Sequence, residues 1–478
     1  MAESLKEKTA KGLLWGAMSN GTTQVINLVF GIFLARLLTP AEYGIVGVLA
    51  VFSVIAGAIQ SGGFGAGLIN LKHATDNDYN SVFWLNICVS CVLYLLLFFC
   101  APAIAAFFKQ PCLILVSRVL FLSLPFSAIA LVSGTYLTKN MLNRELAIIS
   151  VTALVIAGIT GITLALLKFS YWSLVGQQLV YVIVSDIGRF YYAPWRPSLK
   201  IDLEPVKRMF SFCVKIMVTN IIIFINQNIL TFVFGRLFSI SSVGNYSQAN
   251  KWNSMAHSTI SGTVSQIAQT VLVSVSDERE REIRVFRKLL RFTAFLSFPA
   301  MFGLAMVSHE FILLTIGEKW RESIPLLQIL CIGGAFMPFY VLYQNVVITR
   351  GRSDLYMWCN IGQMVIQLAL VLLLYSKGIT AIVLSNCALT ILWLMVWQLL
   401  VKRLIRLRLI DVLKDVAPFL VISFLVLAVS YFATTSITNL VFLLIARILI
   451  SVVLYAGIIK LLQAKVMDEC IAFIRKKG

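Results

Sequence analysis

The chain has 478 residues, of which 59% are hydrophobic and only 13% are charged, and its formal net charge is +19. Soluble domains carry about 25% charged residues, so this sequence lacks the polar side chains needed to cover a globular surface in water. Its mean hydropathy is +0.89, and its long apolar runs lack the alternation of a membrane β-barrel. These properties exclude a soluble globular domain and predict an all-α integral membrane protein.

The apolar runs predict fourteen transmembrane helices. The charged segment 1–12 precedes the first run, which is too long for a signal-peptide core and is therefore expected to be an uncleaved span. The expected spans are 13–35, 43–66, 82–106, 113–136, 146–167, 171–193, 210–234, 242–272, 290–308, 324–348, 355–375, 379–400, 415–433 and 439–459.

The distribution of basic residues sets the expected topology. With the N-terminus in the cytoplasm, 29 Lys and Arg residues lie on the cytoplasmic side and 8 on the outer side, while Lys215, Lys251 and Arg447 lie within spans. This asymmetry follows the positive-inside rule. The positive charge is therefore explained by topology, without nucleic acid as a partner, and both termini are predicted to be cytoplasmic.

Two stretches 200 residues apart indicate an internal repeat. "ARLLTPAEYG" at 35–44 and "GRLFSISSVG" at 235–244 share an arginine, a leucine and a glycine in one register. The same offset relates Asn20 to Asn220 and a Ser-Gly pair at 61–62 to another at 261–262. Each repeat holds six predicted spans, an even number, so both start on the same side of the membrane and form a parallel repeat.

This repeat defines the expected domain organisation. Residues 1–195 form an N-lobe, 196–209 a cytoplasmic linker, 210–410 a C-lobe, and 411–478 two extra helices with a cytoplasmic tail. The charge run at 275–292 is expected to be an inner loop with a surface helix. Two facing bundles leave a cavity between them, where transporters of this kind bind substrate.

Amide side chains mark one face of the first and seventh spans. Asn20, Gln24 and Asn27 follow helical spacing in the first span, and Asn220 and Gln227 do so in the seventh. Amides at membrane depth are costly to expose to lipid, so these faces are expected to point into the bundle or a cavity. They serve either as hydrogen bonds between helices or as contacts to a sugar.

Five cationic or titratable side chains are candidate substrate contacts. Lys251 is about 15 Å deep in the eighth span and Lys215 about 8 Å deep in the seventh, at roughly 1.5 Å per residue. A lysine near the midplane costs about 2.5–3.5 kcal/mol, which bonding to carbonyls and amides or to an anionic substrate would offset. Arg36 and Arg236 end the first span of each repeat, where a structural role is favoured over substrate contact. His257 lies within the eighth span, where a buried, hydrogen-bonded histidine is favoured.

The carboxylates nearest to spans are weak candidates for ion coupling. Asp186 precedes Arg189 by three residues, which favours a local salt bridge, and Glu42 follows the first repeated turn. No acidic residue is expected deep in a span. Cys88 and Cys91 form a C-x-x-C inside an apolar run, where small apolar helix residues are favoured over a metal or redox pair. The sequence predicts no metal and no cofactor.

Four motifs in order resemble one family of bacterial polysaccharide transporters. They are "ARLLTPAEYG" (35–44), "MLNRELA" (141–147), "YWSLV" (171–175) and "LLTIGEKWRESIPLLQIL" (313–330). The chain resembles the Wzx-type polysaccharide transporters of the multidrug/oligosaccharidyl-lipid/polysaccharide (MOP) flippase superfamily. The resemblance implies an inner-membrane flippase that moves undecaprenyl-diphosphate-linked oligosaccharides from the cytoplasmic to the periplasmic leaflet. It also implies that the two extra helices guide the lipid tail.

Two other functions are less consistent with the sequence. An ion-coupled multidrug or cation exporter of the same superfamily should carry a membrane carboxylate, whereas this chain carries lysines in its spans, which favours an anionic substrate. A membrane polymerase or glycosyltransferase should carry paired carboxylates and a large outer loop, which the sequence lacks. The expected partners are the lipid-linked oligosaccharide and the bilayer, with polysaccharide polymerase and chain-length machinery as further candidates.

Overall fold

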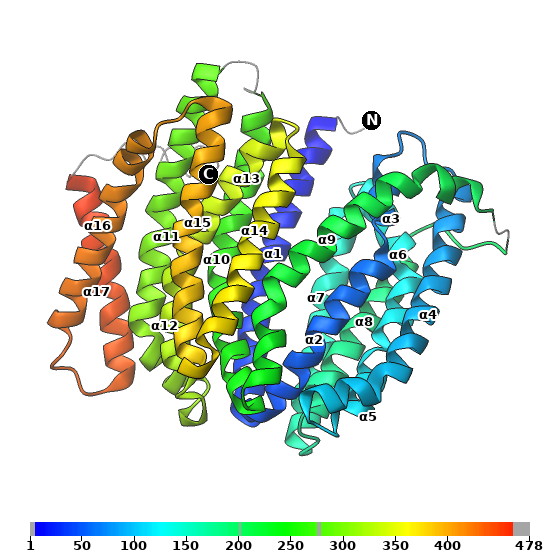
Figure 1. Ribbon diagram of the computed structural model, residues 1–478, viewed down its shortest axis with the longest axis horizontal. Helices are drawn as coiled ribbons and strands as arrows, with labels where there is room; N and C mark the ends of the chain where they lie inside the picture. The colour runs from blue at the N-terminus through cyan, green and yellow to red at the C-terminus, as the bar shows by residue number, and fades with distance from the viewer. Residues whose placement is uncertain (1–4, 200–201, 275–278, 462–478) are drawn as a thin grey trace. The chain divides into compact units, whose positions relative to one another are not determined.

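The computed structural model describes residues 5–199, 202–274 and 279–461 (Figure 1). Within these ranges the chain forms seventeen α-helices and two short 3-10 helices, and the described residues contain no β-strand. The predicted all-α fold class is therefore confirmed.

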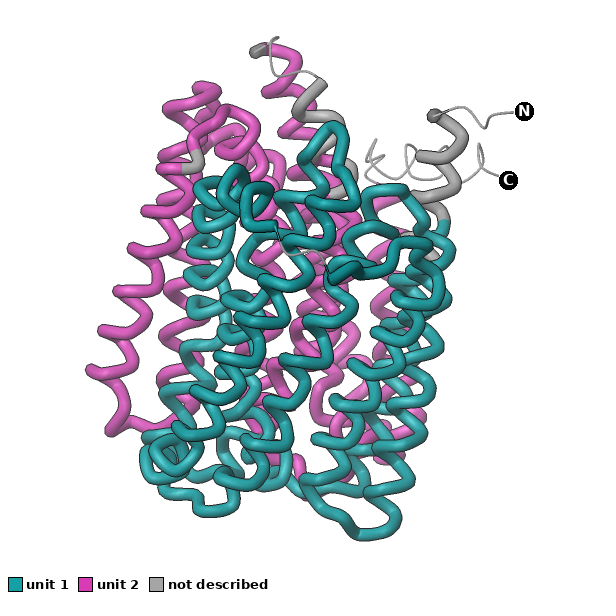
Figure 2. Tube along the Cα trace, turned by 90° about the vertical axis from the view of Figure 1, so that its right-hand side faces the viewer, with its two compact units in different colours: residues 1–244 teal, residues 245–478 magenta. Residues whose placement is uncertain are grey.

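The chain divides into two compact units, residues 1–244 and residues 245–478 (Figure 2). Nine complete helices belong to unit 1, together with the first turn of α10. These helices are α1 (Leu5–Leu37), α2 (Pro40–Ser61), α3 (Phe64–Asn70), α4 (Asp76–Phe108), α5 (Leu113–Leu120), α6 (Ser123–Lys139), α7 (Asn143–Leu166), α8 (Trp172–Tyr192) and α9 (Glu204–Leu237).

Unit 2 contains most of α10 and the remaining described helices. They are α10 (Ile240–Ser274), α11 (Arg279–Thr315), η1 (Glu318–Trp320), α12 (Ser323–Gly334), α13 (Met337–Thr349), α14 (Ser353–Leu374), η2 (Tyr375–Lys377), α15 (Ile379–Ile405), α16 (Leu409–Ala433) and α17 (Leu440–Leu461). By packing, α9 belongs to unit 1, whereas the sequence repeat groups it with the C-lobe. The lobe bounds drawn from the repeat stay a prediction.

The α-helices group into fourteen long segments in the described part of the chain, because α2/α3, α5/α6 and α12/α13 each form one broken helix. Their bounds lie close to the fourteen predicted spans. Eleven of the described segments are long and apolar enough to cross a membrane, and α1, α8 and α10 are not among them. A multi-pass membrane protein is therefore confirmed, while the count of fourteen spans stays a prediction.

A pair of glycines breaks the second helical segment between α2 and α3. The Gly62–Gly63 pair has φ values of +53° and +72°, which a residue with a Cβ rarely adopts. A Cβ at the second glycine would also lie 2.4 Å from the Cys213 carbonyl oxygen of α9. Lys139 donates hydrogen bonds of 2.7 Å to the carbonyls of Leu68 and Leu71 at the end of α3. The break thus lets α3 pack closely against α9.

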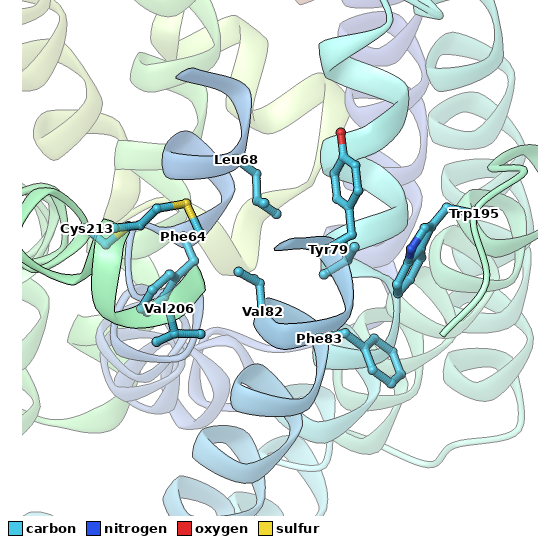
Figure 3. Packing of buried hydrophobic residues seen from close by; sticks show 10 residues of the cluster. Phe64, Leu68, Tyr79, Val82, Phe83, Trp195, Val206 and Cys213 are labelled. Carbon is cyan, nitrogen blue, oxygen red and sulfur yellow. The ribbon is translucent and has the colours of Figure 1, made fainter. Parts of the chain in front are cut away.

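The loop between α8 and α9 is fixed to α4 in unit 1. The Trp84 indole donates to the Ser198 carbonyl, and the Ser198 amide donates to Asn80. Buried apolar residues of α3, α4, α9 and this loop form one cluster, with Trp195 packed beside Phe83 (Figure 3). The described residues 193–199 of this loop, which we call the strap, are therefore held against α4 of unit 1.

Charged residues border this strap. Asp78 of α4 accepts a 2.6 Å hydrogen bond from Arg208 of α9. In the loop itself, hydrogen bonds from the Glu204 amide and the Asn77 side chain hold the pKa of Asp202 below its usual range.

The two extra helices α16 and α17 pack on α11 within unit 2 (Figure 1). At one end of this packing, Asp415 of α16 accepts hydrogen bonds from Arg287 (2.6 Å) and Arg291 (2.9 Å) of α11. At the other end, Arg447 of α17 donates a 2.8 Å hydrogen bond to Glu310 of α11.

Glu310 corrects an expectation from the sequence. This carboxylate is only 3% exposed, although no deep acidic residue was expected in the spans. The reason is that α11 continues to Thr315, beyond the apolar run that was predicted to end at residue 308. Glu310 therefore lies within the helix and not in an outer loop.

Candidate substrate-binding site

Each of the two repeated turns ends in a hydrogen bond between the residue before the helix and the residue three positions later. In the first, the backbone amide and the hydroxyl of Thr39 donate to the Glu42 carboxylate, at 2.6 and 2.8 Å. In the second, the Ser242 amide donates to the Ser239 hydroxyl. A residue that caps a helix in this way satisfies amides that the helix leaves unbonded. The Glu42 carboxylate, a weak candidate for ion coupling, thus has a local structural use.

The arginines of the repeated turns lie at the ends of α1 and α9 with exposed side chains. The Arg236 guanidinium sits 5.2 Å from the centre of the Phe107 ring, within the range of a cation–π contact. Phe107 in turn stacks on Phe232. This arrangement agrees with the structural role that the sequence favoured for Arg236, and the exposure of Arg36 fits the same role.

The amide faces of α1 and α9 leave their side chains without hydrogen-bond partners among the described residues of unit 1. On α1 these side chains are Asn20, Gln24 and Asn27, and all three are at least partly exposed. On α9, Asn220 and Gln227 are also at least partly exposed and lie within about 20° of each other at roughly 100° per residue. Hydrogen bonding between helices of unit 1 therefore does not account for either face.

Lys215 lies apart from the amide face of α9. Its side chain is exposed, and it is about 140° around the helix from Asn220 at roughly 100° per residue. The structure therefore does not bring Lys215 together with the amides of its own helix.

Helix α10 carries one continuous polar face, which includes Lys251 and His257. At about 100° per residue, seven of its polar residues fall within an arc of about 120°, while Asn245, Gln248 and Asn253 lie outside this arc. Sequence reasoning identified only the lysine and the histidine, although helical spacing in "NYSQANKWNSMAHSTISG" would have revealed the others. The further members of this arc are Ser247, Asn250, Ser254, Ser258 and Ser261.

Several polar atoms of the α10 arc have no partner in the described part of the chain. They are the Ser247 hydroxyl, Nδ1 of His257 and the Ser261 hydroxyl, all buried. The sequence favours a buried, hydrogen-bonded His257. Its Nδ1 atom has no hydrogen-bond partner among the described residues. A polar face with unused donors and acceptors is suited to a hydroxyl-rich ligand.

Lys251 differs from the buried carboxylates because no described residue of unit 2 serves as its counterion. Its ammonium lies 5.6 Å from the centre of the neighbouring Trp252 ring, and no described residue of unit 2 forms an ion pair or hydrogen bond with it. By contrast, each buried carboxylate among the described residues contacts an arginine. These pairs are Asp78–Arg208, Asp186–Arg189, Glu282–Arg350, Glu310–Arg447 and Asp415–Arg287.

Asp186, the other weak candidate for ion coupling, forms the local salt bridge that its spacing suggested, at 3.5 Å from Arg189. Its second oxygen is buried without a partner among the described residues. The described residues contain no cluster of His, Cys, Asp or Glu that would hold a metal ion.

A bundle of long apolar helices with polar faces defines a multi-pass membrane protein. Residues 33–325, more than half of the chain, match the family described as polysaccharide biosynthesis protein. The chain belongs to this family of polysaccharide biosynthesis proteins.

Three relatives have names that refer to the biosynthesis or transport of a polysaccharide. The chain is 26% identical to the teichuronic acid biosynthesis protein TuaB of Bacillus subtilis, over 82% of this chain and 80% of the relative. It is 24% identical to the lipopolysaccharide biosynthesis protein WzxC of Escherichia coli, over 74% and 72%. It is also 26% identical to the succinoglycan biosynthesis transport protein ExoT of Rhizobium meliloti, over 70% and 67%.

Solved structures agree on the fold. The lipid II flippase MurJ in its inward closed conformation aligns with a TM-score of 0.78 at 15% identity, covering 95% of this chain and all of MurJ. An inward-facing multidrug resistance MATE transporter of the MOP superfamily aligns with a TM-score of 0.63 at 15% identity, covering 81% of this chain and 98% of that transporter. At this identity the likeness concerns the fold alone.

Proposed function

We propose that this transporter moves an undecaprenyl-diphosphate-linked oligosaccharide from the cytoplasmic to the periplasmic leaflet of the inner membrane by alternating access. Such a substrate carries two phosphates, a hydroxyl-rich head and a long tail. Its passage requires a cation for the diphosphate and hydrogen-bonding side chains for the sugars.

The observation that carries the proposal is the unequal pairing of buried charges. The buried carboxylates of the described residues contact arginines, whereas Lys251 has no counterion in unit 2. An unpaired cation near the middle of a bilayer is costly, and such residues commonly mark substrate or ion pathways. An anionic lipid headgroup would supply the missing partner during transport.

The remaining candidate residues have distinct roles in the proposal. The α10 arc around Lys251 and His257 would bind sugar hydroxyls, together with Asn20, Gln24 and Asn27 of α1 and the amides Asn220 and Gln227 of α9. Lys215, exposed near the predicted inner end of α9, would attract the diphosphate before it enters. Arg36 and Arg236 lie at the predicted outer ends, where they would meet the diphosphate only as it leaves.

The same charge pairing argues against the export of organic cations. A cation exporter needs a carboxylate that its substrate can reach. Here each buried carboxylate of the described residues contacts an arginine, including Asp186, Glu282 and Glu310, which each keep one oxygen without a partner. We therefore favour an anionic substrate.

Substitution of Lys251 tests the proposal. A hydrogen bond to a charged group contributes about 1.5–3 kcal/mol, so Lys251→Ala should lower transport by roughly 10- to 100-fold, at about 1.4 kcal/mol per tenfold. Lys251→Arg should retain part of the activity, and Lys251→Glu should abolish it. The measurement is complementation of a strain that lacks its own polysaccharide flippase, with lipid-linked intermediates assayed by leaflet.

Lys207→Ala is the matched control, because Lys207 is an exposed lysine in the first turns of α9. This variant should transport like the wild-type protein. Normal transport by Lys251→Ala at equal expression would contradict the proposed role of the central cation.

A further inference from the structure

The turn between α15 and α16 of unit 2 gathers positive charge (Figure 1). Helix α15 ends at Ile405 and α16 begins at Leu409, and both helices are long and apolar enough to cross a membrane. The turn is therefore expected at a membrane face. Residues 402–414, which we call the 402–414 cluster, carry five exposed cationic side chains. They are Lys402, Arg403, Arg406, Arg408 and Lys414.

The carboxylates nearest in sequence to these cations are bound to α11 instead. Asp411 lies 3.9 Å from Arg287, and Asp415 accepts hydrogen bonds from Arg287 and Arg291. No cation of the 402–414 cluster forms an ion pair with a described residue of unit 2. The cluster therefore holds an excess of positive charge that its own neighbours do not neutralise.

Buried hydrogen bonds hold the turn in one conformation. Gln398 of α15 is 3% exposed, and its amide donates a 3.0 Å hydrogen bond to the Leu407 carbonyl. The Gln398 carbonyl accepts a 2.9 Å hydrogen bond from the Tyr343 hydroxyl of α13. Leu407 itself is buried between the exposed Arg406 and Arg408. A site that is ordered before it binds loses less conformational entropy when its ligand arrives.

Exposed apolar side chains of α16 lie beside the cations. Ile410 is 63% exposed and Leu413 is 48% exposed. At about 100° per residue, these two side chains and Lys414 share an arc of about 100°, which includes neither Asp411 nor Asp415. A lysine near a helix end lays its stem along the apolar surface and extends its ammonium to the membrane surface. This face of α16 thus combines an apolar surface with a cation.

We propose that the 402–414 cluster is a binding site for an anionic phospholipid of the surrounding bilayer. The cations contact the lipid phosphate, and the acyl chains lie against Ile410 and Leu413. Basic residues beside a membrane span attract anionic lipids, and the attraction grows with each Lys or Arg near the surface. This lipid is a resident partner and not the cargo, so the inference does not rest on the proposed transport function.

The positive-inside rule accounts for the sign of this charge but not for its arrangement. Scattered cations satisfy that rule as well as clustered ones do. Unit 1 offers three exposed cations that are predicted on the same side of the membrane, Lys72, Arg144 and Lys207. Their replacement removes charge from the same predicted side without touching the cluster, and it therefore provides the matched control.

Lipid titration of the purified full-length protein tests the site. The test variant carries Lys402→Gln, Arg403→Gln and Arg408→Gln, and the control variant carries Lys72→Gln, Arg144→Gln and Lys207→Gln. Thermal unfolding is followed in nonionic detergent while phosphatidylglycerol or the zwitterionic phosphatidylcholine is added.

Phosphatidylglycerol should raise the unfolding temperature of the wild-type and control proteins at the same half-maximal lipid concentration. The test variant should need at least about tenfold more of it, because each cation near a membrane surface contributes roughly fivefold in affinity. Phosphatidylcholine should have little effect on any of the three proteins. An equal phosphatidylglycerol requirement for the test and control variants would overturn the site.

Photocrosslinking locates the lipid in the wild-type protein, so it decides the question if the test variant does not fold. A photoreactive phosphatidylglycerol in liposomes should label peptides of the 402–414 cluster several-fold more than a photoreactive phosphatidylcholine does. Equal labelling by the two lipids would contradict the proposal. Stabilisation by a polyprenyl diphosphate and not by phosphatidylglycerol would also overturn it, because the cluster would then bind the cargo. These outcomes are independent of transport by the Lys251 variants.

Discussion

At the scale of single residues, the main finding is that each buried carboxylate of the described residues forms an ion pair with an arginine. Glu310 is 3% exposed and Arg447 is 6% exposed, and the two form an ion pair between α11 and α17. Arg447 also donates to the Thr434 hydroxyl and lies 4.7 Å from the centre of the Tyr431 ring. Removing one partner of such a pair leaves an uncompensated charge, which is costly in a buried site.

Glu310→Gln should therefore destabilise unit 2 strongly. We expect a loss of about 3–5 kcal/mol in the free energy of unfolding, the usual range for breaking a buried pair. The measurement is thermal unfolding of the purified protein in detergent, where the variant should unfold at a clearly lower temperature.

Two further variants make this test specific. Glu318→Gln removes a carboxylate from an exposed pair with Arg321, which should cost only about 0–1 kcal/mol. The double substitution Glu310→Gln with Arg447→Leu removes both buried charges and should recover much of the lost stability. A single Glu310→Gln variant as stable as the wild-type protein would show that the pair does not hold α17.

Part of this charge pattern was predictable from the sequence. Lys251 stood out because a lysine inside an apolar run is rare, and the Asp186–Arg189 contact follows from helical spacing. The Glu310–Arg447 pair could not be predicted from the sequence, because its members are 137 residues apart and Glu310 follows the end of the apolar run. The serines of the α10 arc were missed because serine carries little hydropathy signal when taken alone.

At the scale of elements, α16 and α17 are a bound part of unit 2 and not a loose appendix. Asp415 of α16 and Arg447 of α17 each pair with charged residues of α11. The Tyr455 hydroxyl also donates to the Phe295 carbonyl of α11. Two ionic contacts near opposite ends and one hydrogen bond between them fix these helices in place.

Truncation before residue 411 should therefore lower the amount of inserted protein, in addition to removing a path for the lipid tail. The shortened chain would leave Glu310, Arg287 and Arg291 without their partners, so we expect much less inserted protein. A truncated chain that also carries Glu310→Gln should insert better, because it lacks the buried charge. Membrane content is measured by immunoblot of sedimented membranes, followed by the complementation assay.

The transport result of the rescued truncation decides the role of these helices. Loss of transport at near-normal membrane content would support guidance of the lipid tail by α16 and α17. Full transport by the rescued truncation would reduce them to a structural support of α11.

Most helices could be predicted from the sequence because long apolar runs dominate their boundaries. The breaks were harder to predict. The left-handed Gly62–Gly63 pair is marked by its glycines, and the break between α12 and α13 at 335–336 follows a second glycine pair, Gly333–Gly334, which has no positive φ. Helix α10 was predicted as a span from its apolar run, although it is not among the helices apolar enough to cross a membrane.

At the scale of the whole molecule, the predicted topology rests on the asymmetry of basic residues. Cysteines placed at Lys207 and Arg403 should resist a membrane-impermeant thiol reagent in intact cells, because both positions are predicted to be cytoplasmic. Cysteines at Glu318 and Lys377 should be labelled, because both are predicted to be outside. All four positions are exposed, so burial would not explain a negative result.

Labelling at Arg403 or protection at Glu318 would contradict the fourteen-span count. The parallel repeat would then fail as well, because it requires an even number of spans in each half. The repeat itself was visible in the sequence through the shared register of 35–44 and 235–244. The close approach of the two turns was not visible, since a repeat gives no information on which of its copies touch; a Cβ at Gly44 would lie 2.0 Å from the Ile240 carbonyl oxygen.

The central claim is that this protein moves an anionic lipid-linked oligosaccharide with the help of Lys251. The most direct measurement is transbilayer movement of a polyprenyl-diphosphate oligosaccharide in liposomes that contain the purified protein, beside an organic cation as the competing cargo. The account predicts that the wild-type protein and Lys207→Ala move the lipid and not the cation, and that Lys251→Glu moves neither. Movement of the lipid by Lys251→Glu at the wild-type rate, or movement of the cation instead of the lipid, would contradict it.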